Sequence, residues 1–547
     1  MFVIFPAAIL LRALASICYV PQAESFYVND PKSERAAAEW VAIAPREVVP
    51  ILEPLAKHRA SSGMKSAAIV SIESLRESYK TESTLEAVKK FSIDIKKGRF
   101  LLLVGDGETL PPMVERPGKG SPLAATDTYF VCDDEDHIPD RAIGRIPTKN
   151  PELLKNVIER TIAYEKDTKP AAWRRRVTFL AASGGFGAVI DSALDATVSA
   201  FLDRDLPLEY ELRVMQPDAK STYGIGDENA KTAILNFWNA GALVTIFAGH
   251  GSKHAFHTDV GMGIRPPICN TLDLFNLEVR SGAPFFLIFA CDTGQFINTG
   301  RRANSAAPNA TIASNGEGPA GQPAPSCFAE ALLTQPKGAI GVYAATENSH
   351  PYPDLLIAHE MNELFRSKET LTIGELVLKA KQRVGSGGGE FRSRVDRMAG
   401  LFGLSDAERA RLCEFELAIF TLFGDPAVPL RRPELPAEVS ANVTSGGTVT
   451  SGGVIAFSVA AAVPDGSDVI VTCELTRAAA PRKKGYANAN DRVLERVIGK
   501  ITNGLFAGEL AIPRTASKSG MRRFVIVADV RGEKLQAAGA TIVEVQN

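Results

Sequence analysis

The chain has 547 residues, of which 45% are hydrophobic and 23% are charged, a composition that is typical of globular proteins and excludes a disordered or fibrous one. Lys and Arg total 61 and Asp and Glu total 63, so the net charge of −2 provides no basic field for nucleic acid or anionic lipid. At about 150 residues per domain, the length predicts three to four domains or subdomains. Seven scattered cysteines without a CxxC pair argue against a disulfide framework and a cysteine-rich zinc site.

Residues 1–40 are predicted to form a separate N-terminal segment. The apolar run from Phe2 to Leu11 is too short to span a bilayer but suits the core of a signal peptide, although Arg12 follows it and no basic residue precedes it. The alternative is a buried first strand over residues 2–5. A signal peptide predicts a secreted or extracytoplasmic protein, whereas a strand leaves a cytoplasmic location open. No integral membrane segment is predicted.

Residues 41–432 are predicted to form an α/β region of two subdomains, 41–170 and 171–432. Six apolar runs lack alternation, which is typical of strands buried on both faces of a parallel sheet: Ala67–Val70, Phe100–Val104, Val177–Leu180, Leu243–Phe247, Phe285–Phe289 and Ala339–Tyr343. Helical periodicity lies between them, at Val48–His58, Pro151–Lys166, Ile190–Asp203 and Leu355–Phe365. Strands that alternate with helices predict βαβ crossovers.

Residues 433–547 consist of short β-rich runs separated by glycine-rich turns, a pattern that predicts a small β-sandwich after a linker at Pro433–Pro436. Glycine-rich turns separate four β-rich runs: Val454–Ala460, Val469–Leu475, Leu505–Ile512 and Phe524–Val530. The basic stretch Arg482–Gly485 is predicted to be a solvated hairpin loop.

Two residues at the ends of predicted strands carry the strongest chemical signal. His250 lies between two glycines after one buried strand, and Cys291 follows another strand 41 residues later. Ligands of open parallel sheets bind outside the carboxyl ends of the strands, so neighbouring strands would place both residues in one cleft. A thiol beside an imidazole suits nucleophilic catalysis, and the N–H groups of Gly251 and Cys291 could form an oxyanion hole.

Simpler interpretations stand beside this one. A lone Cys after an apolar run is usually a buried core thiol, and a lone Gly-His-Gly is usually a turn. His254 and His257 are candidates for lining the cleft near His250, although solvated loop histidines are the favoured interpretation. From pattern alone, the catalytic and structural interpretations are about equally supported.

Five segments, in this order, resemble the gingipain family of cysteine peptidases (peptidase family C25), which has a caspase-like fold. They are Phe100–Asp106, Gly249–Ser252, Phe289–Phe296, Ser326–Leu332 and Leu422–Pro426, within a match over residues 41–432. The resemblance implies a caspase-like catalytic domain followed by an immunoglobulin-like domain. It also implies that Cys291 is the nucleophile and His250 the general base.

The resemblance extends to substrate recognition, with departures. Where the family carries a Glu near its catalytic His, this chain has Ser183, which leaves the third, orienting member of a triad open, and the resemblance implies that a Cys/His dyad can suffice. Asp191 or Asp195 would supply the acid that binds a basic P1 side chain, although an Asp at a helix start is more often a cap. Asn348 would line the same pocket.

The acidic stretch Asp133–Asp140 is the candidate metal site. Clustered carboxylates suit Ca²⁺, although an acidic run is usually solvated charge. The resemblance implies a structural calcium ion held by Asp106, the Val131 carbonyl, Asp134 and Asp140. No catalytic cofactor is predicted.

The sequence therefore predicts a cysteine endopeptidase that acts on proteins or peptides through a thioester acyl-enzyme, with a basic P1 preference. The alternatives are a non-catalytic caspase-like scaffold with an adhesive β-sandwich, and another thiol hydrolase or transpeptidase using the same dyad. The oligomeric state is left open.

Overall fold

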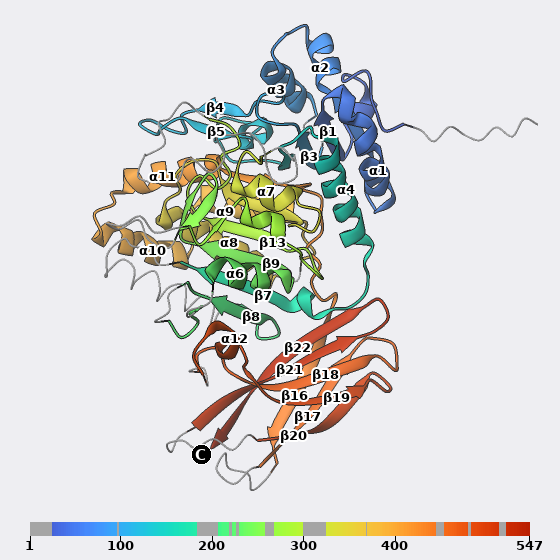
Figure 1. Cartoon of the computed structure of the whole chain (residues 1–547), viewed down its shortest axis with the longest axis vertical. Helices are drawn as coiled ribbons and strands as arrows, with labels where there is room; N and C mark the ends of the chain where they lie inside the picture. The colour runs from blue at the N-terminus through green and yellow to red at the C-terminus, as the bar shows by residue number, and fades with distance from the viewer. Residues whose placement is uncertain are drawn as a thin grey trace, which may run out of the picture.

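The computed structural model of the chain, drawn in Figure 1, describes residues 25–95, 98–182, 206–217, 221–225, 229–257, 267–298, 324–367, 369–444, 453–479, 483–512 and 521–546. The apolar run from Phe2 to Leu11 and the helix expected over residues 190–203 lie outside these ranges. In the part described, no helix has the length and apolarity needed to cross a membrane.

One large sheet organises residues 40–423. Its described strands are ordered β2 (Ala67–Ser71), β1 (Trp40–Ala44), β3 (Phe100–Val104), β6 (Ala142–Ile146), β15 (Phe420–Phe423), β14 (Gly341–Ala345), β13 (Phe285–Phe289), β9 (Val244–Ala248), β7 (Arg176–Ala181) and β8 (Glu211–Met215). Every neighbouring pair is parallel except β14 and β15. The sheet therefore consists of two parallel halves that run in opposite directions and join at that pair, so the protein is a mixed α/β structure with a mostly parallel sheet.

The six strands predicted in this region are confirmed to within a few residues. Each is a short apolar run, and both faces are buried because helices cover the sheet on both sides. The helices are α1 (Val49–Ser61), α2 (Ile72–Tyr79), α3 (Thr84–Asp94), α4 (Pro151–Lys166), α6 (Ala230–Asn239), α7 (Phe328–Thr334), α8 (Pro351–Arg366), α9 (Ile373–Ser386), α10 (Glu390–Leu401) and α11 (Asp406–Ile419).

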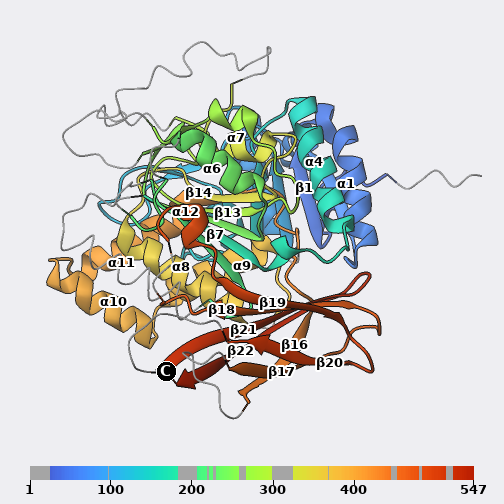
Figure 2. The same cartoon turned by 60° about the horizontal axis from the view of Figure 1, so that its bottom comes forward.

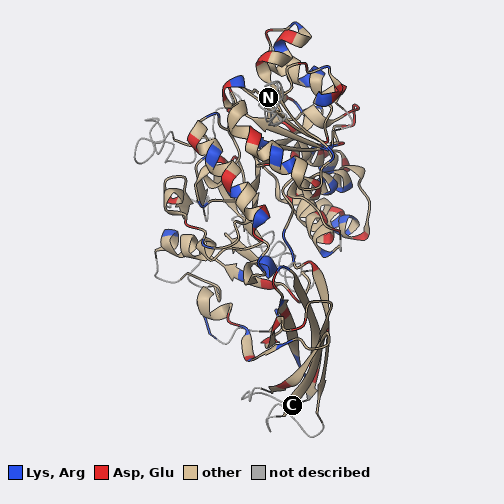
Figure 3. Cartoon of the chain, turned by 90° about the vertical axis from the view of Figure 1, so that its right-hand side faces the viewer, with Lys and Arg blue, Asp and Glu red and all other residues tan. Residues whose placement is uncertain are grey.

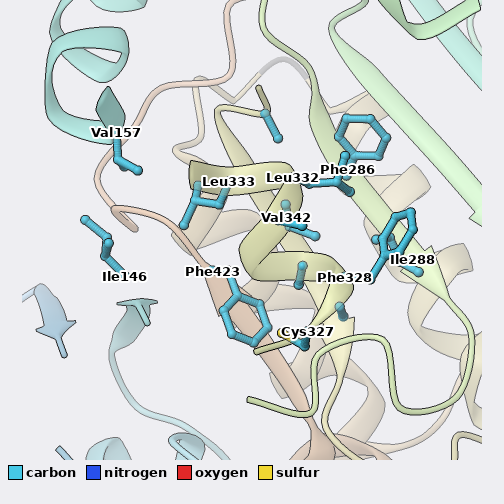
Figure 4. Packing of buried hydrophobic residues seen from close by; sticks show 14 of the residues in the cluster. Ile146, Val157, Phe286, Ile288, Cys327, Phe328, Leu332, Leu333, Val342 and Phe423 are labelled. Atoms are coloured by element: carbon cyan, nitrogen blue, oxygen red, sulfur yellow. The ribbon is translucent and has the colours of Figure 1, made fainter. Parts of the chain in front are cut away.

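Alternating side chains of one strand pack against different helices. In β13, Phe286 and Ile288 join the core under α1, α4, α6 and α7, whereas Phe285 and Leu287 join the core under α8, α9 and α11. Figure 4 shows the first of these cores, where Phe286 lies near Leu332 and Ile288 near Phe328, both of α7. A third core lies between the first half of the sheet and the helices α2 and α3.

The helices begin where side chains satisfy their first N–H groups. Asn150 accepts from the N–H groups of Glu152 and Leu153, and Pro151 occupies the first helical position, so α4 begins at the predicted residue. It also ends at the predicted residue, Lys166. Capping boxes start two other helices: Thr372 with Glu375 at α9, and Ser405 with Glu408 at α11.

A buried ion network holds the junction strand to the first half of the sheet. Asp425, just after β15, accepts from Arg59 Nε at 2.9 Å, from the Trp40 indole at 3.0 Å and from the Ala427 N–H at 3.0 Å. Arg59 also pairs with Glu165 at the end of α4, at 2.7 Å. Arg59 and Asp425 are both 1% exposed, so each charge depends on the other for compensation.

The C-terminal region forms a separate β unit. Its described strands are ordered β19 (Val493–Lys500), β18 (Asp468–Leu475), β21 (Met521–Arg531), β22 (Gln536–Gln546), β16 (Leu435–Val443), β17 (Val454–Ala461) and β20 (Leu505–Ala511). The four predicted strands are confirmed. All pairs are antiparallel except β16 with β22. The two outer strands touch, since a Cβ added to Gly499 would lie 2.2 Å from the Phe506 ring, so the unit curls around its own core.

This β unit covers the free edge of the large sheet at β8, where Figure 1 shows the short helix α12 (Tyr486–Ala489) beside that strand. Figure 2 shows the strands of the unit grouped below the α/β part of the chain. The Asn490 amide accepts from the Val214 N–H and donates to the Val214 carbonyl, each at 2.7 Å, as a further strand would. Beside it, the Gly485 N–H donates to the Thr222 carbonyl at 2.9 Å. An edge with paired backbone groups is protected from other strands.

One sequence prediction needs correction at this boundary. The linker at Pro433–Pro436 is partly structured, since β16 starts at Leu435 and Glu434 pairs with Arg174 at 2.6 Å. In the basic stretch, Lys483 and Lys484 are exposed, as a solvated loop predicts, Gly485 is held by its bond to Thr222, and Arg482 lies outside the described residues. Figure 3 shows acidic and basic residues mixed over the surface, in keeping with the near-zero net charge.

The network around Asp425 leads to a stability prediction. Asp425→Asn keeps an acceptor for Trp40 but leaves the buried Arg59 without that charge, so we expect the free energy of unfolding to fall by about 3 kcal/mol in urea denaturation followed by tryptophan fluorescence. Glu86→Gln, which breaks the exposed Glu86–Lys90 pair at 2.6 Å, is the control and should leave the transition unchanged. Equal behaviour of the two variants would contradict a structural role for the network.

Candidate active site

The pairing of β9 with β13 places the two singled-out residues at the same level. Ala248 at the end of β9 is in register with Phe289 at the end of β13, and the Gly249 N–H continues the ladder by donating to the Phe289 carbonyl at 3.2 Å. His250 and Cys291 each follow two residues after this matched pair. They therefore follow the carboxyl ends of two adjacent parallel strands, His250 at the start of a short hairpin and Cys291 in a turn, and both are partly exposed.

Gly251 packs directly against the turn that carries Cys291. A Cβ at this position would lie 2.8 Å from the Cys291 carbonyl oxygen and 2.7 Å from Thr293 Cγ2, so only glycine fits. The Phe256 carbonyl accepts from the Ile268 N–H, on the far side of β11 (Ala255–His257). Gly251 and Phe256 are thus a non-hydrogen-bonded pair, and the Gly251 N–H points away from β11.

The turn after Cys291 is held by the loop that follows β14. Asp292 has a φ of +58°, a left-handed conformation that Asp tolerates better than most residues. Its N–H donates to the Glu347 carbonyl at 3.1 Å, and the Gly294 N–H donates to the Ala345 carbonyl at 2.7 Å. The Cys291 thiol itself faces the Ser349 carbonyl at 3.7 Å.

The surroundings of Cys291 favour the protonated thiol. Burial raises the pKa of Cys291 to about 11, and the nearby charges of Asp292 and Asp354 add to this. A thiol in this state needs a base to remove its proton before it can attack a carbonyl.

A pair of buried acids lies behind the loop over Cys291. Asp354 in the first turn of α8 and Glu416 near the end of α11 hydrogen-bond to each other, and Glu416 also accepts from the His350 N–H at 3.3 Å. Burial raises the pKa of both carboxyl groups, and the Asp354 charge raises the pKa of Glu416 further, so the pair retains a proton at neutral pH. The Asp354 Oδ1 atom is buried without a hydrogen-bond partner.

The hairpin of β10 (His250–Ser252) and β11 supplies the histidine side of the site. Phe256 of β11 is fully buried and stacks on Phe247 with ring centroids 3.7 Å apart, and on Phe328 of α7 at 4.1 Å. This aromatic stack fixes the hairpin on the core. His254 and His257 are half-buried, so the prediction that they are solvated is wrong.

Comparisons with known proteins agree with this geometry. The sequence profile of peptidase family C25 matches residues 33–431. The chain belongs to peptidase family C25. Gingipain R2 of Porphyromonas gingivalis (strain ATCC BAA-308 / W83) is 23% identical over 434 residues, which are 75% of this chain and 49% of that protein. Gingipain R1 of Porphyromonas gingivalis is 24% identical over 61% of this chain and 28% of its own length. The chain thus spans about half or less of these relatives.

Two solved structures are similar in fold to this C25 member. The crystal structure of the Arg-specific cysteine proteinase gingipain R matches with a TM-score of 0.51 at 18% identity, over 94% of this chain and 99% of that one. A structure described as a protease matches with a TM-score of 0.52 at 16% identity, over 96% and 99% of the two chains. The resemblance seen in five segments is therefore confirmed at the level of family and fold.

Several residues that the C25 resemblance singled out lie outside the described part, namely Ser183, Asp191 and Asp195. Asn348 is described and lies between Glu347 and Ser349, whose carbonyls hold the Cys291 turn. The sequence interpretation missed Asp354 and Glu416. Asp354 follows Asn348 by only six residues, but Glu416 approaches it through tertiary packing, for which the local sequence carries no signal.

The structure does not gather the residues expected to bind calcium. β3 and β6 are parallel and in register. Asp106 follows the carboxyl end of β3 whereas Asp140 precedes the amino end of β6, so the two lie toward opposite ends of the strands. Asp134 Oδ1 and Asp140 Oδ2 instead accept backbone N–H groups of their own loop. Among the described residues, no group of three or more His, Cys, Asp or Glu is arranged to hold a metal. The four residues therefore do not fit a shared calcium ion in this arrangement, and calcium binding by the chain stays a prediction.

The raised pKa of Cys291 predicts a pH dependence for its alkylation. In the ligand-free protein, the rate of carbamidomethylation by iodoacetamide should rise about tenfold per pH unit from pH 7 to pH 10, because only the thiolate reacts. Mass spectrometry of the Cys291 peptide measures the rate, and the urea-unfolded protein is the control, in which the curve should level off near the ordinary thiol pKa of about 8.5. A plateau below pH 8 in the folded protein would instead indicate a preformed thiolate–imidazolium pair.

Proposed function

We propose that the chain is a cysteine endopeptidase that uses Cys291 as nucleophile and His250 as general base and acid. The observation that carries this proposal is the β9–β13 register. His250 and Cys291 each follow a matched strand end by two residues, at the carboxyl end of the parallel strands, where ligands bind in such sheets. Membership of family C25 adds independent support. Because the local environment favours the neutral thiol, His250 has to remove the proton as the attack occurs.

The reaction proceeds in two steps. The Cys291 sulfur attacks the carbonyl carbon of the scissile peptide while His250 takes the thiol proton, and a thioester forms when the C–N bond breaks and the amine leaves with that proton. Water then attacks the thioester with His250 again as base, which releases the acid and restores the thiol. The oxygen that becomes negative in each step would be bound by the N–H groups of Gly251 and Cys291. The orientation of the Gly251 N–H, away from β11, supports this role.

Substrate recognition belongs to the same proposal. A basic P1 side chain is supported by the resemblance and by the buried acid Asp354, whose carboxyl group lies behind Ser349 with one oxygen unpaired. Asp191 and Asp195 remain candidates for the same pocket. The C-terminal β unit is proposed to be an immunoglobulin-like domain, and an extracytoplasmic location is proposed from the N-terminal apolar run.

The central test is covalent labelling of the full chain. Acyloxymethyl ketone probes with Arg, Lys, Asp or Asn at P1 should label the wild type, with the basic probes fastest, and labelling should be lost in Cys291→Ala and fall at least 100-fold in His250→Ala. Cys132→Ala removes the other partly exposed cysteine in the described part and should label normally. Absence of Cys291-dependent labelling by every probe would favour the binding-scaffold alternative, and labelling by the Asp probe alone would refute the basic P1.

Gly251 provides a second test of the oxyanion hole. Gly251→Ala should lower kcat by about 100-fold or more, because the new Cβ pushes the hairpin away from the Cys291 turn and misplaces one N–H donor. The matched control is Gly400→Ala, where a Cβ in α10 meets no atom closer than 3.5 Å and activity should be retained. Steady-state hydrolysis of a fluorogenic peptide measures both, and circular dichroism checks the fold. Full activity of the Gly251 variant would remove it from the site.

A further inference from the structure

Helix α7 begins between the two sides of the candidate site. The first N–H groups of a helix have no partner within it, so other segments have to satisfy them. The Phe328 N–H donates to the Lys253 carbonyl at 2.8 Å, in the turn between β10 and β11. The Ala329 N–H donates to the Thr293 carbonyl at 2.9 Å, in the turn that follows Cys291. The first turn of α7 therefore joins the β10–β11 hairpin to the Cys291 turn.

Side-chain packing reinforces both of these bonds. The Phe328 ring stacks on Phe256 of the hairpin, with ring centroids 4.1 Å apart. On the other side, Thr293 is fully buried and its hydroxyl donates to the Ala290 carbonyl at 3.2 Å. Every residue of α7 is itself buried, so the helix has little room to tilt. A change in the direction of its first turn would therefore shift the hairpin relative to the Cys291 turn.

Glu330 fixes the direction of that first turn. Its Oε2 atom accepts from the Ser326 N–H at 2.7 Å and also from the Ser326 hydroxyl. Cys327, which occupies the capping position, makes no side-chain hydrogen bond to the helix, so Glu330 supplies the side-chain contact that closes the helix start. The carboxyl group thus ties the incoming chain to the third residue of the helix, much as the Glu of a capping box does.

The burial of Glu330 distinguishes it from the same contact elsewhere in the chain. At the start of α11, Glu408 accepts from the Ser405 N–H at 2.9 Å and from the Ser405 hydroxyl at 2.8 Å, and both residues are exposed. Glu330 is only 6% exposed, and burial raises its pKa to about 7 although the Ser326 hydrogen bonds lower it. Burying a carboxyl group costs free energy. Because the exposed pair at α11 shows that a helix start does not require this cost, a role in the surroundings of Glu330 is indicated.

We propose that Glu330 is a positioning residue for the site of Cys291 and His250. Through Ser326 it sets the first turn of α7, and the two N–H groups of that turn hold the β10–β11 hairpin against the Cys291 turn. Its effect on the reaction is indirect, since it acts through the backbone hydrogen bonds of α7. This inference rests on the proposed function, and it adds a residue that lies outside the segments carrying the nucleophile and the base.

Substitutions at Glu330 test the proposal in the full chain. Glu330→Ala should lower kcat by about tenfold or more with little change in KM, because a hairpin that moves relative to the Cys291 turn misplaces the base rather than the substrate. Glu330→Gln keeps an acceptor for Ser326 and should restore most of kcat. Ser326→Ala removes one of the two donors and should lower kcat about threefold, so it serves as the second variant where Glu330→Ala does not fold.

Glu408→Ala is the matched control. It removes the same pair of hydrogen bonds at the start of α11, so it should lower the midpoint of thermal unfolding slightly but leave kcat unchanged. Circular dichroism measures the unfolding, and hydrolysis of a fluorogenic peptide well below the transition measures kcat and KM. A wild-type kcat in Glu330→Ala, or a loss of kcat shared equally by Glu408→Ala, would overturn the inference.

A readout without substrate separates this inference from the proposed function. Hydrogen–deuterium exchange, read by mass spectrometry with electron-transfer fragmentation, should be about tenfold faster at the Phe328 and Ala329 amides in Glu330→Ala than in the wild type. The Gly424 amide, which donates to the Arg145 carbonyl at 2.7 Å, is the internal control and should exchange at the same rate in both. Unchanged exchange at Phe328 and Ala329 would overturn the positioning role. A wild type that never cleaves peptide, yet shows this response, would refute the peptidase and still support Glu330 as the residue that holds the two segments together.

Discussion

The register between β9 and β13 is the constraint on which the candidate site depends. A parallel pair of strands fixes which residues emerge side by side, and here it brings His250 and Cys291 to the same level beyond the strand ends. A slip of one residue would turn every side chain of the strand to the other face, so the hydrophobic residues that hold the register also protect the chemistry. Phe286 and Ile288 of β13 pack in one core while Phe285 and Leu287 pack in the other, so the strand is held in place from both faces.

The two halves of the sheet meet close to this site, and a buried charge network anchors the strand at which they meet. β14 and β15 run antiparallel, and the loop after β14 crosses the Cys291 turn, so Cys291 lies next to the only change of strand direction in the described sheet. The network of Arg59, Asp425 and Glu165 anchors β15 from the opposite side. A buried charge network of this kind contributes specificity of arrangement more than net stability, because each partner becomes costly when it is left alone.

Much of the sheet could be predicted from sequence because each central strand is a short apolar run that ends in glycine or a polar residue. The strands that were missed show what such patterns lack. The four missed strands of the described large sheet are β1, β6, β8 and β15. β8 is only half-buried, β15 continues directly from α11, and β6 contains Gly144 and Arg145, so none of these stands out as an isolated apolar run, whereas β1 is a buried apolar run that the expected boundary at residue 40 divided. The candidate site could be predicted for the same reason, since His250, Gly251 and Cys291 each directly follow an apolar run in the sequence. The acid pair does not, because Glu416 approaches Asp354 through helix packing across more than 60 residues of chain.

The C-terminal β unit changes how the whole chain should be understood. An adhesive module on a flexible tether would leave the edge strand β8 unpaired, yet the Asn490 amide completes the Val214 backbone pair and Arg477 donates to the carbonyls of Pro207 and Tyr210. Glu434, in the predicted linker, is held by both Arg174 and the Gln536 N–H. These contacts satisfy backbone groups that the sheet would otherwise expose, and β8 pairs with β7, which in turn pairs with β9 beneath His250. The β unit, although a sheet of its own, therefore protects the large sheet, since removing it would leave the edge strand β8 exposed two strands away from β9.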